Sequence, residues 1–179
     1  MNRNTPMTAE HDVRETPPAL YLAQDARFHF TLDACATHQN AKAPLYFTEK
    51  GLFRRPFPGA QTLLDSSVDG LTGSWKGERV WCNPPYSDIG AWLMKAWDSD
   101  AESVTMLVPA TRTEQDWWQD GVEPYRDGRY DNRDLGWSSF SVEFLRGRQH
   151  FLKDGKPILN PKTGKRSSPK FGCCLLIWS

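Results

Sequence analysis

The spacing of apolar residues along this chain predicts alternating strands and helices. Phe28, Phe30 and Leu32 alternate with polar residues, which is typical of a strand that ends at Asp33. Other strands are expected at residues 45–49, 61–64, 78–82, 103–109, 140–144 and 171–178. Helices are expected at residues 16–25 and 89–97, and a third is expected to begin at residues 113–116. This alternation predicts a layered α/β fold.

The length of 179 residues is sufficient for one domain with a full core. We expect this domain to span residues 16–179, preceded by a flexible tail over residues 1–15. Glycine, proline and charge predict loops at residues 51–59, 121–138 and 153–169. The chain has no apolar run long enough to span a bilayer, and its first residues lack the apolar stretch of a secretory signal. A cytoplasmic location without membrane contact is therefore expected.

The formal net charge of zero conceals an uneven distribution of charge. The segment from Arg146 to Lys170 carries a charge of +7, and the remainder of the chain carries −7. Its basic residues are Arg146, Arg148, Lys153, Lys156, Lys162, Lys165, Arg166 and Lys170. Such one-sided charge suits contact with a phosphate backbone, and a merely solubilising loop is the alternative.

The cysteines and histidines do not show the spacing of a metal site. The four cysteines are Cys35, Cys82 and the adjacent pair Cys173 and Cys174, which lies in an apolar run. Buried structural thiols are the expected role of these residues. We expect neither a bound metal nor disulfides.

The corner Asn83-Pro84-Pro85-Tyr86 lies between a predicted strand and a predicted helix. In open α/β sheets, ligands bind outside the carboxyl ends of the strands, which is where this corner falls. The Asn83 side-chain oxygen and the Pro84 carbonyl are two acceptors that can draw an aromatic amino nitrogen toward tetrahedral geometry. The two prolines fix the backbone, and Tyr86 offers a flat face on which an extruded base can stack. A plain turn is the alternative, but it leaves the bulky Tyr86 unexplained.

The corner resembles the signature of amino-group methyltransferases that use S-adenosylmethionine. A larger part of the chain resembles a narrower family, the small phage and prophage DNA N-6-adenine methyltransferases. The matching strings are FTLDACAT (30–37), NAK (40–42), YFT (46–48), DGL (69–71), Trp75, RVWCNPPYS (79–87), MLVPATRTEQDWW (106–118) and VEFLRGRQHF (142–151). The resemblance implies a Rossmann-like methyltransferase domain whose mostly parallel, seven-stranded sheet is flanked by helices. It also implies methyl transfer to the N-6 amino group of a flipped-out adenine, in DNA that we expect to be double-stranded.

The resemblance also assigns roles to individual residues. Asn83, Pro84, Pro85 and Tyr86 would hold the target adenine. The residues expected to bind the cofactor are Thr16, Pro17, Asp33, Ala34, Cys35, Ala36, Thr37 and Asp69. The basic residues of the segment from Arg146 to Lys170 would contact DNA phosphates. Because Ala34-Cys35-Ala36 replaces the glycine-rich turn of many methyltransferases, the chain departs from that pattern after its first strand.

Two competing hypotheses remain open at this level. The same corner serves enzymes that methylate other amino or amide groups, such as a protein glutamine or an RNA base. A catalytically silent DNA-binding module of the same fold is the other. The segment between YFT (46–48) and DGL (69–71) is longer than the family resemblance leads us to expect, and it contains residues 51–67. These residues form either an inserted recognition loop or a surface excursion.

Overall fold

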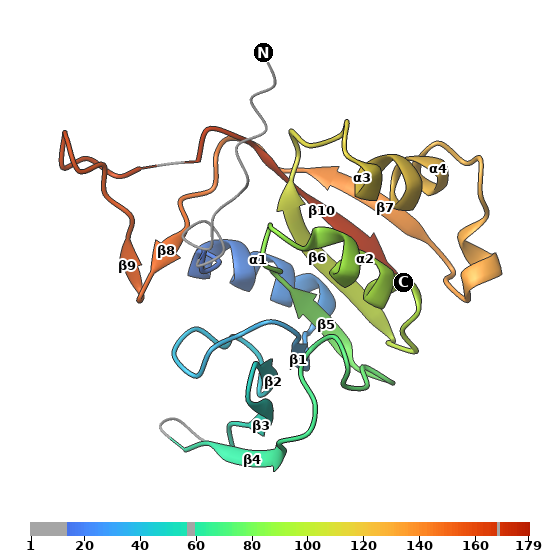
Figure 1. Cartoon of the computed structure of the whole chain (residues 1–179), viewed down its shortest axis with the longest axis horizontal. Coiled ribbons are helices and arrows are strands. Elements are labelled where there is room, and N and C mark those ends of the chain that lie inside the picture. Colours follow the sequence, from blue (N-terminus) through green and yellow to red (C-terminus); the bar gives the residue numbers. More distant parts are fainter. Residues whose placement is uncertain (1–13, 57–59, 168) are drawn as a thin grey trace.

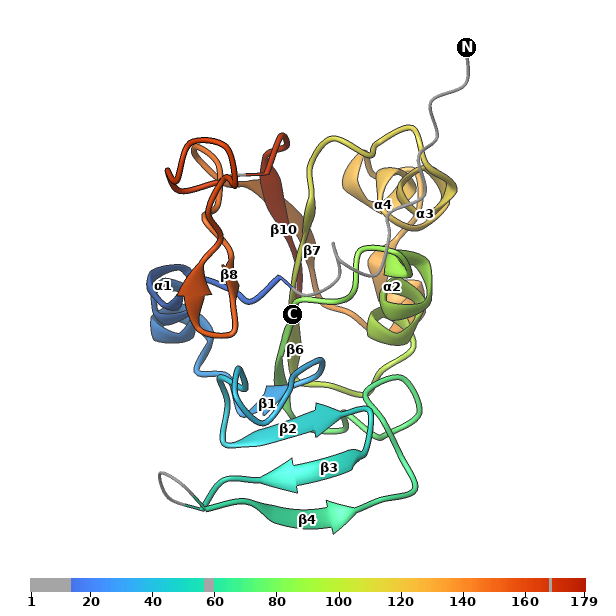
Figure 2. The same cartoon turned by 60° about the vertical axis from the view of Figure 1, so that its left-hand side comes forward.

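The computed structural model describes residues 14–56, 60–167 and 169–179. One large sheet separates two layers of helices (Figure 1), with α1 on one face and α2, α3 and α4 on the other (Figure 2). The helices are α1 (Pro18–Phe28), α2 (Ile89–Trp97), α3 (Asp116–Gly121) and α4 (Glu123–Arg126), with a 3-10 turn over Asn132–Leu135. The predicted α/β layering is thus confirmed in outline.

The sheet of the described chain has eight strands in the order β4-β3-β2-β1-β5-β6-β10-β7. They are β1 (Leu32–Asp33), β2 (Leu45–Thr48), β3 (Gly51–Arg54), β4 (Thr62–Asp65), β5 (Arg79–Cys82), β6 (Ser103–Pro109), β7 (Phe140–Phe144) and β10 (Cys173–Trp178). β1 pairs in parallel with β2 and β5, and β5 pairs in parallel with β6. The other pairings are antiparallel, so that among the described strands β3 and β10 run against the remaining six.

The extra strand relative to the expected seven is β3, which lies in a segment predicted to be a loop. Two prolines and one glycine at residues 56–59 suggested irregular structure there, but Gly51–Arg54 turns back and pairs with β2. Phe53 stacks on Tyr46 with ring centroids 5.8 Å apart, and this contact between side chains stabilises the hairpin. A pairing of this kind depends on the facing strand, which a local pattern does not include.

The first expected strand is shorter than its alternating pattern suggested. Phe28 still belongs to α1, which ends in a left-handed residue, His29, at φ 51°. Phe28 and Phe30 therefore pack between the helix and the sheet, and Phe30 lies 5.4 Å from Trp81 between ring centroids. β1 comprises Leu32 and Asp33, and both are buried.

The core lies along β6 and β10, every residue of which is buried. These are two of the apolar runs that predicted buried strands, and the prediction is confirmed. The expected loop at residues 121–138 contains α4 and the 3-10 turn. The expected loop at residues 153–169 includes part of a small hairpin of β8 (Leu152–Lys153) and β9 (Lys156–Pro157).

Most of the tail expected at residues 1–15 lies outside the described residues. Its last two residues, Arg14 and Glu15, are described, and Glu15 forms a bridge with Leu152 through two backbone hydrogen bonds of 3.0 Å. No helix in the described ranges combines the length and apolar character that crossing a membrane requires.

Candidate functional site

The carboxyl ends of β2, β1 and β5 meet at one edge of the sheet because these strands are parallel neighbours. Asp33 ends β1, Asn83 directly follows β5, and Thr48 ends β2. This edge is where open α/β sheets bind ligands. Two cavities lie here, and both are lined by Cys35 and Ala36 of the loop after β1.

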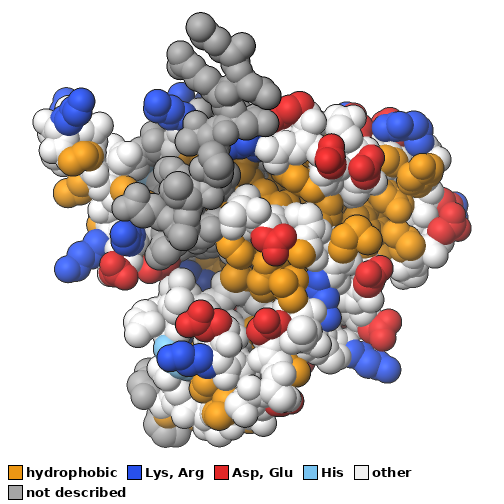
Figure 3. Space-filling view, in the orientation of Figure 1, with side chains coloured by type: hydrophobic (Ala, Val, Ile, Leu, Met, Phe, Trp, Pro, Cys, Tyr) orange, Lys and Arg blue, Asp and Glu red, His pale blue; other side chains and the backbone are white. Residues whose placement is uncertain are grey.

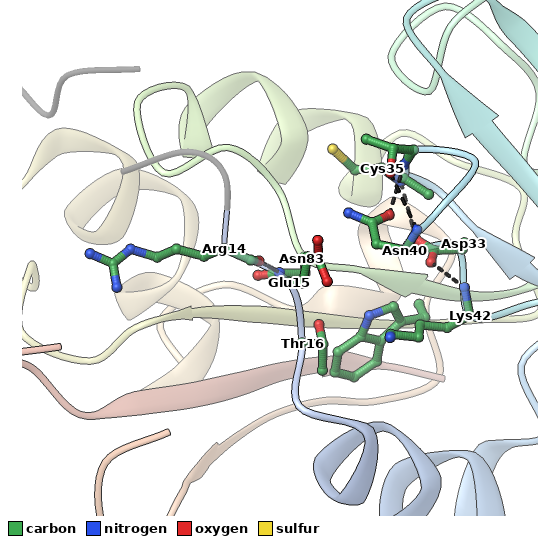
Figure 4. A pocket seen from close by; sticks show the side chains of 11 residues that line it. Arg14, Glu15, Thr16, Asp33, Cys35, Asn40, Lys42 and Asn83 are labelled. Carbon is green, nitrogen blue, oxygen red and sulfur yellow. Dashed lines mark hydrogen bonds between the residues drawn. The ribbon is translucent and has the colours of Figure 1, made fainter. Parts of the chain in front are cut away.

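The first cavity has a volume of about 150 Å³, and eight of its eleven lining residues have polar or charged side chains (Figure 4). It is lined by Arg14, Glu15, Thr16, Asp33, Cys35, Ala36, Thr37, Asn40, Lys42, Trp81 and Asn83. Strand ends, the loop after β1 and the segment before α1 contribute to it together. The cavity therefore brings the corner after β5 into contact with the loop after β1.

Asp33 is the buried carboxylate of this cavity, with 3% of its surface exposed. Its Oδ2 accepts a hydrogen bond of 2.9 Å from the Lys42 amide, and its Oδ1 accepts one of 3.4 Å from the Cys35 amide. Burial raises the pKa of Asp33 to about 7, although these amide donors and the nearby Lys42 and Arg55 charges oppose the rise. Asp33 thus holds the two ends of the loop between β1 and β2 in place and keeps acceptor capacity for a cationic ligand.

Asn83 presents an acceptor without a partner at the same cavity. Its Nδ2 donates to the Arg14 carbonyl at 2.5 Å, and because a carbonyl only accepts, this contact fixes which way the amide faces. Its Oδ1 is buried and accepts no hydrogen bond from any described residue. A buried acceptor without a donor is costly, so an N–H group supplied by a ligand would stabilise it.

Tyr86 is buried beside the corner, with 6% of its surface exposed. Its ring meets the edges of Phe151 and Phe171 at centroid distances of 6.2 and 6.0 Å. Burial raises the pKa of its hydroxyl well above the usual value. In this conformation, Tyr86 packs against aromatic side chains and does not line either cavity described here.

The second cavity, of about 220 Å³, combines apolar faces with carboxylates. It is lined by Ala34, Cys35, Ala36, Phe47, Thr48, Glu49, Asp69, Gly70, Pro85 and Trp92. Asp69 is held there by its own turn, and hydrogen bonds from the Thr72 amide and hydroxyl keep the pKa of Asp69 below its usual range. A Cβ on Gly70 would lie 2.0 Å from the Ala34 carbonyl oxygen, so that only glycine lets this turn approach the loop after β1.

The structure brings most of the sequence-predicted site residues together. Of those expected to bind the cofactor, Thr16, Asp33 and Thr37 line the first cavity, Ala34 and Asp69 the second, and Cys35 and Ala36 both. Pro17 is instead the N-cap residue of α1. Of the corner, Asn83 lines the first cavity and Pro85 the second, whereas Pro84 is buried alongside them.

Sequence reasoning missed several residues of these cavities. Glu49 directly follows β2, and its position after a predicted strand was the available signal. Trp92 was expected to be a core residue; it is buried and stacks on Trp75, yet it also lines the second cavity. Glu15 gave no signal, because it was placed in the tail.

The basic segment forms an arm between β7 and β10 that includes β8 and β9. All eight basic residues from Arg146 to Lys170 are exposed, and none forms an ion pair with a carboxylate of the described chain. Lys153 and Lys156 face each other across the β8–β9 hairpin. In Figure 3 the arm carries lysine and arginine side chains, while acidic side chains lie mainly on the rest of this face.

The donor set of the site contains few metal ligands. Within the described ranges, no three or more His, Cys, Asp or Glu side chains are grouped so that they could hold a metal ion. The carboxylates of the two cavities are instead separated along the edge of the sheet, on different loops. The polar and apolar linings suit an organic ligand with a cationic end and a flat ring.

The fold is that of an α/β protein with two cavities at the carboxyl ends of parallel strands, where such sheets bind ligands. Residues 60–179 match the model of the family described as DNA N-6-adenine-methyltransferase (Dam). This match covers about two thirds of the chain, and the chain belongs to that family of DNA-methylating transferases. No curated protein matches the chain. The matched range contains Asn83–Tyr86, Asp69 and the basic arm, whereas the loop after β1 lies before it.

Proposed function

We propose that this protein transfers a methyl group from S-adenosylmethionine to the N-6 amino group of an adenine flipped out of DNA. The observation that carries this proposal is the unpaired Asn83 Oδ1 at the first cavity. An exocyclic amino group is a poor nucleophile because its lone pair is delocalised into the ring. A hydrogen bond from that amino group to Asn83 Oδ1 opposes this delocalisation and directs the lone pair toward the methyl donor.

The residues of the two cavities fit S-adenosylmethionine, which supplies an electrophilic methyl group on a sulfonium when bound. Asp33 would pair with the amino group of its methionine portion, and Thr16 and Thr37 would border that portion. Phe47 and Trp92 offer apolar faces for the adenine ring of the cofactor. Glu49 and Asp69 would accept hydrogen bonds from the ribose hydroxyls, as acids beyond the first strand do in dinucleotide sites.

The target base has to leave the duplex to reach Asn83, because the side-chain oxygen of this residue is buried at the edge of the sheet. The exposed basic arm supports contact with DNA phosphates, since its charges are not neutralised by carboxylates of the described chain. The root of the arm supplies Phe151 and Phe171, which pack on Tyr86. Stacking of the base on Tyr86 therefore requires these two rings to move aside.

Methyl transfer is tested with cofactor labelled on its methyl group and with DNA, RNA and protein as acceptors. We expect label in DNA, at the N-6 position of adenine. Label confined to RNA or to protein glutamine would contradict the DNA assignment. Failure to bind the cofactor in calorimetry, with DNA binding intact, would identify a silent DNA-binding module instead.

The Asn83→Ala variant tests the role of the corner. We expect kcat to fall roughly 10²- to 10³-fold, because the variant loses an acceptor that acts on the reacting nitrogen. The Kd for the cofactor, measured by calorimetry, should change little. An equal loss in cofactor affinity would show that Asn83 serves the cofactor rather than the base.

A further inference from the structure

The segment Arg14–Thr16 connects Asn83 to the basic arm, although these parts are far apart in sequence. On one side, the Arg14 carbonyl accepts the hydrogen bond from Asn83 Nδ2. On the other side, Glu15 pairs through its backbone with Leu152 of β8. The segment thus forms a single β-bridge with the hairpin, and Figure 4 shows it passing next to Asn83.

The Glu15 side chain secures this connection. Its Oε2 accepts a hydrogen bond of 3.1 Å from the Gly155 amide, in the turn between β8 and β9. Asp154 and Gly155 have φ values of 52° and 70°, and two adjacent residues with positive φ are typical of a tight hairpin turn. Glu15 is 8% exposed, whereas Gly155 is exposed at the hairpin turn, so that this hydrogen bond is partly buried. Lys153 and Lys156 flank the turn residues Asp154 and Gly155.

Arg14 adds a second contact to the same part of the arm. Its guanidinium lies over the rings of Phe151 and Phe171, at 5.7 and 5.4 Å from their centroids. These are the two rings that pack on Tyr86. The segment whose carbonyl accepts the hydrogen bond from Asn83 is therefore in direct contact with the arm.

We infer that Glu15 is a positioning residue, which holds the Arg14 carbonyl where it turns Asn83 Oδ1 toward the substrate nitrogen. Through Glu15, the hairpin that meets DNA phosphates also sets the orientation of the catalytic amide. This inference rests on the proposed function of Asn83, but it concerns a different residue and a different contact. Glu15 acts by accepting a hydrogen bond from the Gly155 amide. The side chain at position 15 therefore has to be long enough to place an acceptor oxygen there, whereas its negative charge is not required.

Two conservative variants separate hydrogen bonding from charge. Glu15→Gln keeps an acceptor at the same reach, whereas Glu15→Asp keeps the charge and withdraws the acceptor by one methylene. We expect Glu15→Asp and Glu15→Ala to slow single-turnover methylation of DNA roughly 10- to 100-fold, with the cofactor Kd within about threefold of wild type. Glu15→Gln should recover most of the rate. Glu143→Ala, which breaks the surface ion pair with Arg27, is the matched control and should keep the wild-type rate.

A nuclear magnetic resonance readout tests the same contact without catalysis. The side-chain amide signal of Asn83, assigned through its loss in Asn83→Ala, should shift in Glu15→Asp and remain near its wild-type position in Glu15→Gln. If wild-type protein methylates no DNA, the proposed function fails, and this signal still decides whether Glu15 orients Asn83. The inference is overturned if Glu15→Asp outperforms Glu15→Gln, if the cofactor Kd rises as much as the rate falls, or if the Asn83 signal does not move.

Discussion

At the scale of single residues, the site depends on polar atoms whose partners are only partly supplied by the protein. Asn83 Oδ1 is buried without a donor from the described chain, and Asp33 is a buried carboxylate with two amide donors. Both atoms lie at one cavity, where a ligand with N–H groups and positive charge would satisfy them. Local sequence indicated both residues, since Asp33 ends a strand and Asn83 directly follows one.

The raised pKa of Asp33 predicts that cofactor affinity depends on pH. Since burial raises this pKa to about 7, the carboxyl is increasingly protonated below pH 7 and then offers no charge to an ammonium. The α-amino group of a ligand stays largely protonated up to about pH 7.5. We therefore expect the Kd for S-adenosylmethionine to rise as the pH falls below 7, approaching a tenfold increase for each pH unit. A tenfold change in Kd corresponds to about 1.4 kcal/mol of binding free energy.

Calorimetry at pH 6.0, 6.5, 7.0 and 7.5 measures this dependence. The Asp33→Asn variant is the control, because it cannot ionise, and its weaker affinity should vary little over the same range. Parallel curves for the two proteins would show that another group causes the pH dependence.

Tyr86 provides a second test at this scale. Its buried hydroxyl has no hydrogen-bond partner of normal geometry among the described residues, so that Tyr86→Phe should keep activity and leave the free energy of unfolding unchanged or raise it by about 1 kcal/mol. Tyr86→Ala removes a ring packed between Phe151 and Phe171, and should cost about 3–5 kcal/mol of stability as well as activity. Urea denaturation and methyl-transfer assays measure both effects. Equal damage from the two variants would contradict a role for the ring face.

At the scale of elements, the sequence predicted the central strands of the sheet better than the strands added at its edge. β6, β10 and the strand before the corner were expected from apolar runs. β3 was predicted as part of a loop because proline and glycine follow it closely, whereas its pairing with β2 comes from the facing strand. Residues 51–67 therefore widen the sheet at one edge, with β4 outermost.

The basic arm supports a prediction about DNA affinity. Neutralising Lys162, Lys165 and Arg166 to Gln should reduce the slope of log K against log salt by up to about 2.7, since each phosphate contact contributes about 0.9. Fluorescence anisotropy with a labelled duplex at several salt concentrations measures this slope. A matched triple variant of Lys76, Arg129 and Arg133, which are exposed outside the arm, should leave the slope unchanged. Equal slopes for wild type and the arm variant would exclude phosphate contact by these residues.

At the scale of the whole molecule, opposite net charges belong to different parts of the chain. The arm carries +7, and the rest of the chain carries −7. Arg14 and Glu15 fasten the root of the arm beside the corner after β5. A long charged ligand held on the arm would thus lie next to the cavity that contains Asn83.

The sequence alone determined the local features of this protein. Apolar periodicity predicted the buried strands, and turn chemistry and charge located the corner and the basic segment, because these signals arise between residues close in the chain. Tertiary structure decided which residues meet across long separations, such as Glu15 with Gly155 and Arg14 with Asn83. Such contacts depend on strand register and on how closely loops approach one another, and neither is encoded in a local pattern.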